Sequence, residues 1–267
     1  MKAYLSLFKM KLISVLQYRA AALAGIATQL FFGLVFIMVY LTFYESNDTT
    51  YPMKVNQLVN YLWLNQAFFA LVYIWVKDKD FLSMVKNGNI AYELCRPMNF
   101  YFKWFSTMYG ARIANVTLRF LPVIVIAVLL PSPYNMTLPA TLENFILFIV
   151  SLIISSILVT SITMIFHLVT IYTLDEKGVV SFLKVFGEIF SGGTVPIVFF
   201  PKFMQFVAKL LPFQYICDLP FRIYSGNIDL SASYMTLVGG LIWSVVIIIF
   251  GYFLSRKALS RSSVQGG

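Results

Sequence analysis

Several ionisable side chains lie inside long apolar segments of the sequence, among them Arg119, His167 and Glu188. Charges are costly in apolar surroundings, so such residues commonly mark substrate contacts, proton relays or buried ion pairs. At 1.5 Å of helix per residue, Glu188 lies about 15 Å into its segment, and Arg119 lies at a similar depth in another. We expect these two side chains to approach each other, either as a structural pair or as contacts for a polar solute.

Other polar residues favour simpler interpretations. Arg112 shares a helix face with Arg119, seven residues later, but lies nearer the segment end, so we expect its side chain to snorkel to the lipid headgroups. His167 lies about one turn from the end of its segment, which is more typical of a packing residue than of a proton relay. One histidine and two cysteines, Cys95 and Cys217, are too few for a histidine-rich metal centre. We predict neither a metal site nor a cofactor.

The sequence lacks the patterns that support hydrolytic catalysis. The phosphate-binding pattern GxxxxGK[ST] is missing, because no Gly-Lys pair precedes a Ser or Thr. That pattern supplies the backbone groups that cradle nucleotide phosphates. No HExxH helix or Ser-His-Asp order is present either. We predict that the chain is not an enzyme and that its function lies in the passage of a solute or in partnership with another protein.

Composition excludes a water-soluble globule. Of 267 residues, 60% are hydrophobic and 12% are charged, whereas soluble domains have about 45–50% apolar and about 25% charged residues. The net charge is +9, but the basic residues are scattered between apolar runs, which argues against nucleic-acid binding.

The apolar segments predict an all-α integral membrane protein with one transmembrane domain over residues 1–267. About 20 apolar residues in a helix cross a hydrocarbon core of about 30 Å. The predicted spans are approximately 20–44, 57–76, 105–130, 142–172, 178–200 and 234–254. Residues 1–19 carry their apolar side chains on one helix face and are predicted to lie in the membrane interface. The alternative is a cytoplasmic extension of the first span.

The distribution of basic residues predicts the orientation. Segments 1–20, 77–104, 173–184 and 255–267 hold four, five, two and three Lys or Arg, whereas the opposite loops hold four in total. Short cytoplasmic loops are enriched in Lys and Arg. We therefore predict six spans in the cell membrane, with both termini in the cytoplasm. The polar break at 175–177 falls on the same side.

The fifth apolar segment is predicted to break inside the membrane. Its first 13 residues, 178–190, give about 20 Å of helix, which is too short to cross. Glycine and proline, which weaken or interrupt helices, then follow at Gly192, Gly193, Pro196 and Pro201. We expect residues 201–225 to fold back near the outer surface and the region 191–201 to act as a gate. A merely kinked span is the alternative.

The stretch 81–103 is too polar to cross a membrane but has an apolar side formed by Phe81, Met84, Val85 and Ile90. Apolar residues at this spacing lie on one face of a helix. We predict a short amphipathic helix on the cytoplasmic side, followed by a turn.

Two parts of the sequence resemble a known family. In residues 84–97, Gly88 precedes Ile90 by two positions, and Leu94-Cys95-Arg96-Pro97 closes the stretch. This order resembles the coupling helix in permease subunits of ATP-binding-cassette exporters of the second type. The glycines and prolines between 191 and 226 are similar to that family's broken fifth span and re-entrant helices. The resemblance covers nearly the whole chain.

The resemblance implies an exporter built from two permease subunits, alike or related, and a cytoplasmic ATPase dimer. Residues 81–95 would then sit in a groove of the ATPase. The coupling residues carried over on this basis are Phe81, Met84, Val85, Gly88, Ile90, Glu93 and Arg96. An ATP-independent channel or secondary carrier stays open as an alternative, as does a membrane scaffold. A carrier is expected to hold several acidic or polar groups at mid-span, and here only Glu188 qualifies.

Overall fold

A computed structural model of the chain describes residues 2–46, 51–74, 76–173 and 176–262. Residues 47–50 of the first predicted outer loop and Asp175 of the polar break lie outside the described residues. All regular elements in the described part are helical. In chain order they are α1 (Lys2–Leu16), α2 (Arg19–Ser46), α3 (Val55–Ala67), α4 (Phe69–Val72), α5 (Lys79–Lys86), α6 (Ile90–Leu94), α7 (Phe100–Leu129), α8 (Leu142–Thr173), α9 (Glu176–Phe190), η1 (Ile197–Phe199), α10 (Lys202–Leu210), η2 (Pro212–Tyr215), α11 (Asp218–Tyr224) and α12 (Leu230–Ser262).

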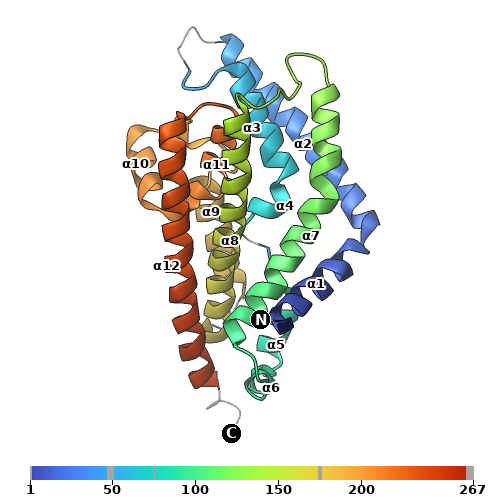
Figure 1. The fold of residues 1–267 in the computed structure, drawn as a ribbon, viewed down its shortest axis with the longest axis vertical. Helices are drawn as coiled ribbons and strands as arrows, with labels where there is room; N and C mark the ends of the chain where they lie inside the picture. The colour runs from blue at the N-terminus through green and yellow to red at the C-terminus, as the bar shows by residue number, and fades with distance from the viewer. Residues whose placement is uncertain (1, 47–50, 75, 174–175, 263–267) are drawn as a thin grey trace.

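Four helices in the described residues are long and apolar enough to cross a membrane. They are α2, α7, α8 and α12, with candidate spans of 26, 30, 32 and 31 residues. All four run roughly along the long axis of the molecule (Figure 1). They coincide with the first, third, fourth and sixth predicted spans. Helix α8 is the most enclosed of the four, whereas α2 and α12 expose many large apolar side chains, as lipid-facing helices do.

The second predicted span, 57–76, is interrupted and is not one continuous helix. Helix α3 ends at Ala67, Phe68 departs from helical geometry, and the short α4 ends at Val72. Tyr73 then adopts an extended conformation. The sequence gives no signal for this break, because no helix-breaking Gly or Pro lies there. The carbonyl groups freed where α4 ends are bound by a side chain from another helix, as described below.

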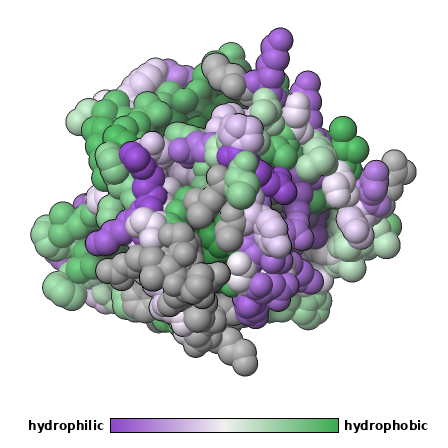
Figure 2. All heavy atoms as spheres, turned by 90° about the horizontal axis from the view of Figure 1, so that it is seen from below, coloured by the Kyte–Doolittle hydropathy of each residue, from purple (hydrophilic) through white to green (hydrophobic). Residues whose placement is uncertain are grey.

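Figure 1 places α5, α6, the start of α1 and the end of α12 at one end of the molecule. The connection between α7 and α8 lies at the opposite end, and α10 and α11 pack in that half. Helix α1 lies across α7, close to the first end. Figure 2 shows hydrophilic side chains gathered over part of this end, beside hydrophobic flanks.

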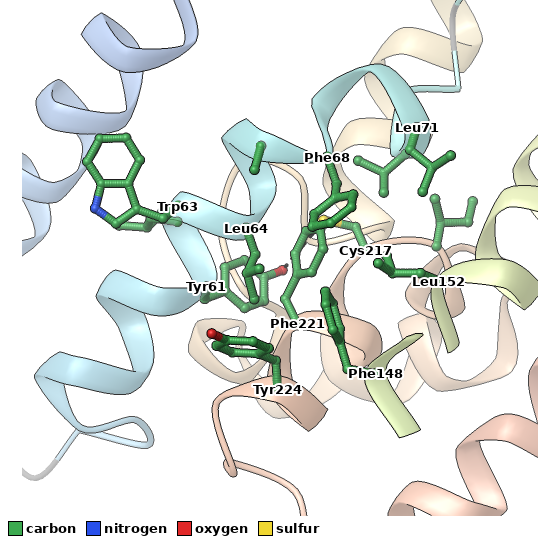
Figure 3. Close-up of a cluster of buried hydrophobic side chains, with 14 of the residues drawn as sticks. Tyr61, Trp63, Leu64, Phe68, Leu71, Phe148, Leu152, Cys217, Phe221 and Tyr224 are labelled. Carbon is green, nitrogen blue, oxygen red and sulfur yellow. Dashed lines mark hydrogen bonds between the residues drawn. The ribbon is translucent and has the colours of Figure 1, made fainter. Parts of the chain in front are cut away.

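Two apolar clusters hold the bundle together. The larger cluster joins α3, α8 and α11 through Tyr61, Trp63, Phe68, Phe148 and Phe221, which are all buried (Figure 3). Aromatic rings of this size each bury a large apolar area. The smaller cluster lies at the end that carries α5 and joins that helix to α7 and α8. The two clusters therefore brace opposite halves of the molecule.

Candidate functional site

The first candidate region is the loop formed by α5 and α6. Asp78 caps α5, because its side chain accepts a hydrogen bond of 2.9 Å from the backbone N–H of Phe81. The helix ends before Gly88, which has a φ of +68°. A residue at this left-handed φ is strained unless it is glycine. The cap and the glycine thus fix both ends of a short helix whose sequence also gives it one apolar face.

The apolar face of this loop points into the chain. Phe81, Met84, Val85 and Ile90 are all less than 10% exposed, and they pack in the smaller cluster with Trp104 and other residues of α7 and α8. The expectation that these side chains contact a partner directly therefore needs correction. They anchor the loop instead, because burying apolar area stabilises the contact between α5 and the bundle.

The opposite face of the loop is exposed and polar. Its exposed residues are Lys79, Asp80, Ser83, Lys86, Asn87, Gly88, Asn89, Tyr92, Cys95 and Arg96. Tyr92 is 71% exposed and adds a large side chain to this face. Of the predicted coupling residues, only Gly88 and Arg96 lie on it. The sequence pattern predicted the apolar side of this helix, and the structure buries that side against the bundle.

Glu93 has a structural partner. Its carboxylate forms an ion pair with Lys103 of α7, and both side chains are about nine-tenths buried. Arg96 lies 3.5 Å from the other carboxylate oxygen. Removing one member of a buried pair leaves the other charge unpaired. Glu93 therefore holds α6 against α7.

Arg112 does not snorkel, contrary to expectation. It is 5% exposed, and its Nη1 donates to the carbonyl oxygens of Leu71 at 2.8 Å and Tyr73 at 2.6 Å. Its Nη2 donates to the hydroxyl of Thr163 on α8 at 3.2 Å. Guanidinium carries several donors in fixed geometry. Arg112 thus satisfies the carbonyl groups freed where α4 ends, and it ties α4, α7 and α8 together.

His167 is held between two backbone groups. Its Nδ1 lies 2.8 Å from the carbonyl oxygen of Thr163, and its Nε2 accepts a hydrogen bond of 3.0 Å from the backbone N–H of Asp78. This pairing assigns the proton to Nδ1. His167 therefore links α8 to the start of α5, as a packing residue does.

Arg119 and Glu188 line different cavities. The guanidinium of Arg119 lies against Gly25 of α2 and between two cavities. Glu188 lines a third, smaller cavity with Tyr73 and Ser191. The distance of a residue from the end of its segment gives its position along the helix axis. It does not tell which neighbouring helix the side chain faces.

The break after α9 is held by polar groups from other helices. The Tyr61 hydroxyl donates to the carbonyl oxygen of Gly192 at 2.8 Å, and the Asn65 amide donates to that of Gly193. The backbone N–H of Asp218 donates to the carbonyl of Ser191 at 2.9 Å. Gly192 has a φ of +78°. Backbone groups freed in an apolar setting need such partners.

Pro196 and Pro201 each precede a short helical element, η1 and α10 respectively. Asp218 joins this region to α11, because its Oδ1 accepts a hydrogen bond of 2.8 Å from the Ile197 N–H. Its Oδ2 pairs with Arg222 at 3.2 Å. Sequence reasoning missed Asp218 and the polar residues of α3. The spacing of four between Asp218 and Arg222, and the run of amides in α3, are the signals that mark them.

The family model for ABC-2 family transporter proteins matches residues 30–266. The chain belongs to the ABC-2 transporter family. A comparison with curated proteins gives no significant match. Family membership identifies the chain as a multi-pass membrane permease of the ATP-binding-cassette type, whose members are normally not catalytic themselves.

Among residues 2–46, 51–74, 76–173 and 176–262, no three His, Cys, Asp or Glu side chains lie close enough to share a metal ion. Two regions of this ABC-2 permease described above are the exposed face of α5–α6 and the hydrogen bonds around Gly192.

Proposed function

We propose that this ABC-2 permease is the membrane subunit of an ATP-driven exporter. Six spans are then formed by α2, the pair α3–α4, α7, α8, α9 together with the broken segment up to residue 200, and α12. Helix α1 lies in the interface, α10 and α11 form a re-entrant segment near the outer surface, and both termini face the cytoplasm of the cell. The family match and the missing phosphate-binding pattern support a division of labour in which a separate ATPase supplies energy.

The observation that carries the proposal is the two-sided build of α5–α6. One face is fixed to α7 and α8 by Phe81 and its buried neighbours, and the other is exposed, polar and rich in charged side chains. A loop anchored in this way can transmit a push from a docked ATPase dimer to the long helices. Interfaces of this kind gain specificity from a polar rim and from anchors such as Tyr92.

A second permease subunit, of the same or a related chain, completes the pathway in this proposal. The exposed apolar side chains of α2 offer a surface for that subunit and for lipids, and include Phe31, Met38 and Phe43. The gate is the region 191–201, where the helix is broken and held by polar contacts. Closure of the ATPase pair would move the two permeases against each other and change the contacts around this gate.

Copurification tests the ATPase partnership. We would replace Lys86 by Glu and Tyr92 by Ala together, purify the tagged permease from its membrane, and quantify copurified phosphate-loop ATPase by mass spectrometry. The expected result is a loss of about tenfold or more, which corresponds to about 1.4 kcal/mol. Lys202→Glu, on the exposed surface of α10 at the other end, is the matched control. Undiminished ATPase in the double variant, or none with the unaltered chain, would overturn the proposal.

A further inference from the structure

Two cavities flank the Arg119 side chain between α2, α3–α4 and α7. Their volumes are about 330 and 270 Å³, and the larger falls within the range of small-molecule sites. Arg119, Phe69 and Tyr73 line both cavities. The larger cavity is also lined by Gly193 and Thr194, so it reaches the break after α9.

Polar atoms without protein partners converge on the larger cavity. Gln29 is 5% and Asn65 4% exposed, yet the Oε1 of Gln29 and the Oδ1 of Asn65 accept no hydrogen bond. The Nε of Arg119 is buried and also lacks a partner. Buried polar groups are normally hydrogen-bonded, and each exception calls for an explanation. All three residues line this one cavity.

Among these three residues, Arg119 needs an explanation most, because its side chain carries a charge. An arginine stays protonated in proteins, and a charged side chain within a membrane helix is usually paired with another charge or with backbone carbonyl groups. Arg112, about two turns away in the same helix, has three hydrogen-bond partners. Arg112 is therefore a structural side chain, whereas we infer that the partner of Arg119 is a group outside the chain.

The surroundings provide space for the guanidinium and an apolar wall beside it. A Cβ atom at Gly25 would lie 2.8 Å from both Cζ and Nη1 of Arg119, so only a residue without a side chain leaves the guanidinium where it is. Phe32 and Phe36 of α2 join Phe69 in lining the same cavity. Aromatic side chains bind hydrocarbon and ring systems through large apolar contact areas.

We propose that this cavity binds an amphipathic organic anion. Its carboxylate, phosphate or sulfonate group pairs with Arg119, since guanidinium matches the geometry of such anions. Hydroxyl or amine groups next to the anion donate to Gln29 and Asn65, and the apolar part lies against Phe32 and Phe36. This inference rests on the proposed export function and names the chemical class of its cargo. Soluble amphiphiles and anionic lipids share this chemistry.

Ligand-induced stabilisation of the purified full-length chain tests the site. Decyl phosphate is added to protein in a neutral detergent, with decanol and decyltrimethylammonium as neutral and cationic probes of the same chain length. A ligand that binds the folded state raises its unfolding temperature. We expect decyl phosphate alone to raise the unfolding midpoint. The concentration needed should increase about tenfold or more in Arg119→Gln and less in Arg119→Lys.

Two variants keep the test informative if Arg119→Gln fails to fold. Gly25→Leu fills the space beside the guanidinium and should weaken the response to decyl phosphate while Arg119 is retained. Lys202→Gln removes an exposed cation outside the cavity and should leave the response unchanged. Equal shifts from the three probes, or an unchanged response in both cavity variants, would overturn the inference.

Nanodiscs distinguish the two sources of the anion. If a lipid headgroup occupies the site, protein in nanodiscs that contain phosphatidylglycerol should no longer respond to decyl phosphate, whereas protein in phosphatidylcholine nanodiscs should respond. If the site takes a soluble amphiphile, both should respond. None of these measurements needs an ATPase, so a failed binding test leaves the copurification result intact, and a failed copurification leaves the binding result intact.

Discussion

The loop α5–α6 and the break after α9 differ in their main interactions, although the Glu93–Lys103 ion pair and the hydrogen bond between His167 and Asp78 also hold the loop. Phe81 and its neighbours fix the loop by burying apolar surface, which is non-directional. The break around Gly192 is fixed by directed hydrogen bonds from Tyr61, Asn65 and Asp218. The loop is therefore expected to tolerate replacement of one apolar side chain by another but not by a polar one. The break is expected to tolerate few changes of backbone geometry.

The largest expected effect comes from placing a charge in the apolar anchor. Met84→Asp buries a carboxylate at a side chain that is 8% exposed, with a free-energy cost of several kcal/mol. We expect it to lower the thermal unfolding midpoint in detergent strongly, in addition to any loss of ATPase binding. Lys86→Asp on the exposed face is the matched control and should keep the midpoint nearly unchanged. Equal midpoints for the two variants would show that Met84 is not buried.

A smaller effect is expected from adding one methyl group at the break. In Gly192→Ala the new Cβ would lie 2.6 Å from the Tyr61 hydroxyl at a φ of +78°, which costs about 2–3 kcal/mol from strain and displaced contacts. Gly193→Ala is the control, because its nearest neighbour would be the Ser191 hydroxyl at 3.3 Å and no positive φ is involved. Unfolding midpoints compare the two, and a cost at Gly193 as large as at Gly192 would contradict this account.

The smallest effect concerns the contact between α1 and α5. Burial lowers the pKa of Lys11, but its hydrogen bond to Asp80 and the charges of Asp78 and Asp80 outweigh this and raise the pKa above the usual 10.5. The folded state therefore gains stability from the charged amine below about pH 10.5, and this gain is lost as the pH rises through the higher pKa of the folded state. Because Asp80 is 68% exposed, the gain is about 0.5 kcal/mol.

The measurement for this contact is the unfolding midpoint of Lys11→Gln relative to the unaltered chain. The difference should be small at pH 7, shrink in high salt, and disappear at strongly alkaline pH. A difference that grows as the pH rises above 10.5 would contradict the assigned sign.

Sequence patterns predicted the features that depend on composition along one helix. The four long helices, the apolar side of α5 and the helix end before Gly192 all follow from the order of apolar, glycine and proline residues. The end of α4 at Val72 could not be predicted in this way, because the carbonyl groups of Leu71 and Tyr73 are bound from another helix by Arg112. The face that each helix turns to its neighbours was likewise missed for Arg112 and the α5 side chains. Those contacts depend on tertiary packing, which periodicity does not specify.

The central claim, that an ATPase docks on the exposed face of α5–α6, is tested most directly by photocrosslinking in the native membrane. A photoreactive amino acid at Asn87 lies on the exposed face, and one at Leu138, which is 85% exposed, lies at the opposite end of the bundle. We expect Asn87 to crosslink to a protein that carries a phosphate-binding loop, identified by mass spectrometry, and Leu138 to form no such product. Crosslinking of that ATPase at Leu138 but not at Asn87, or at neither position, would contradict the account.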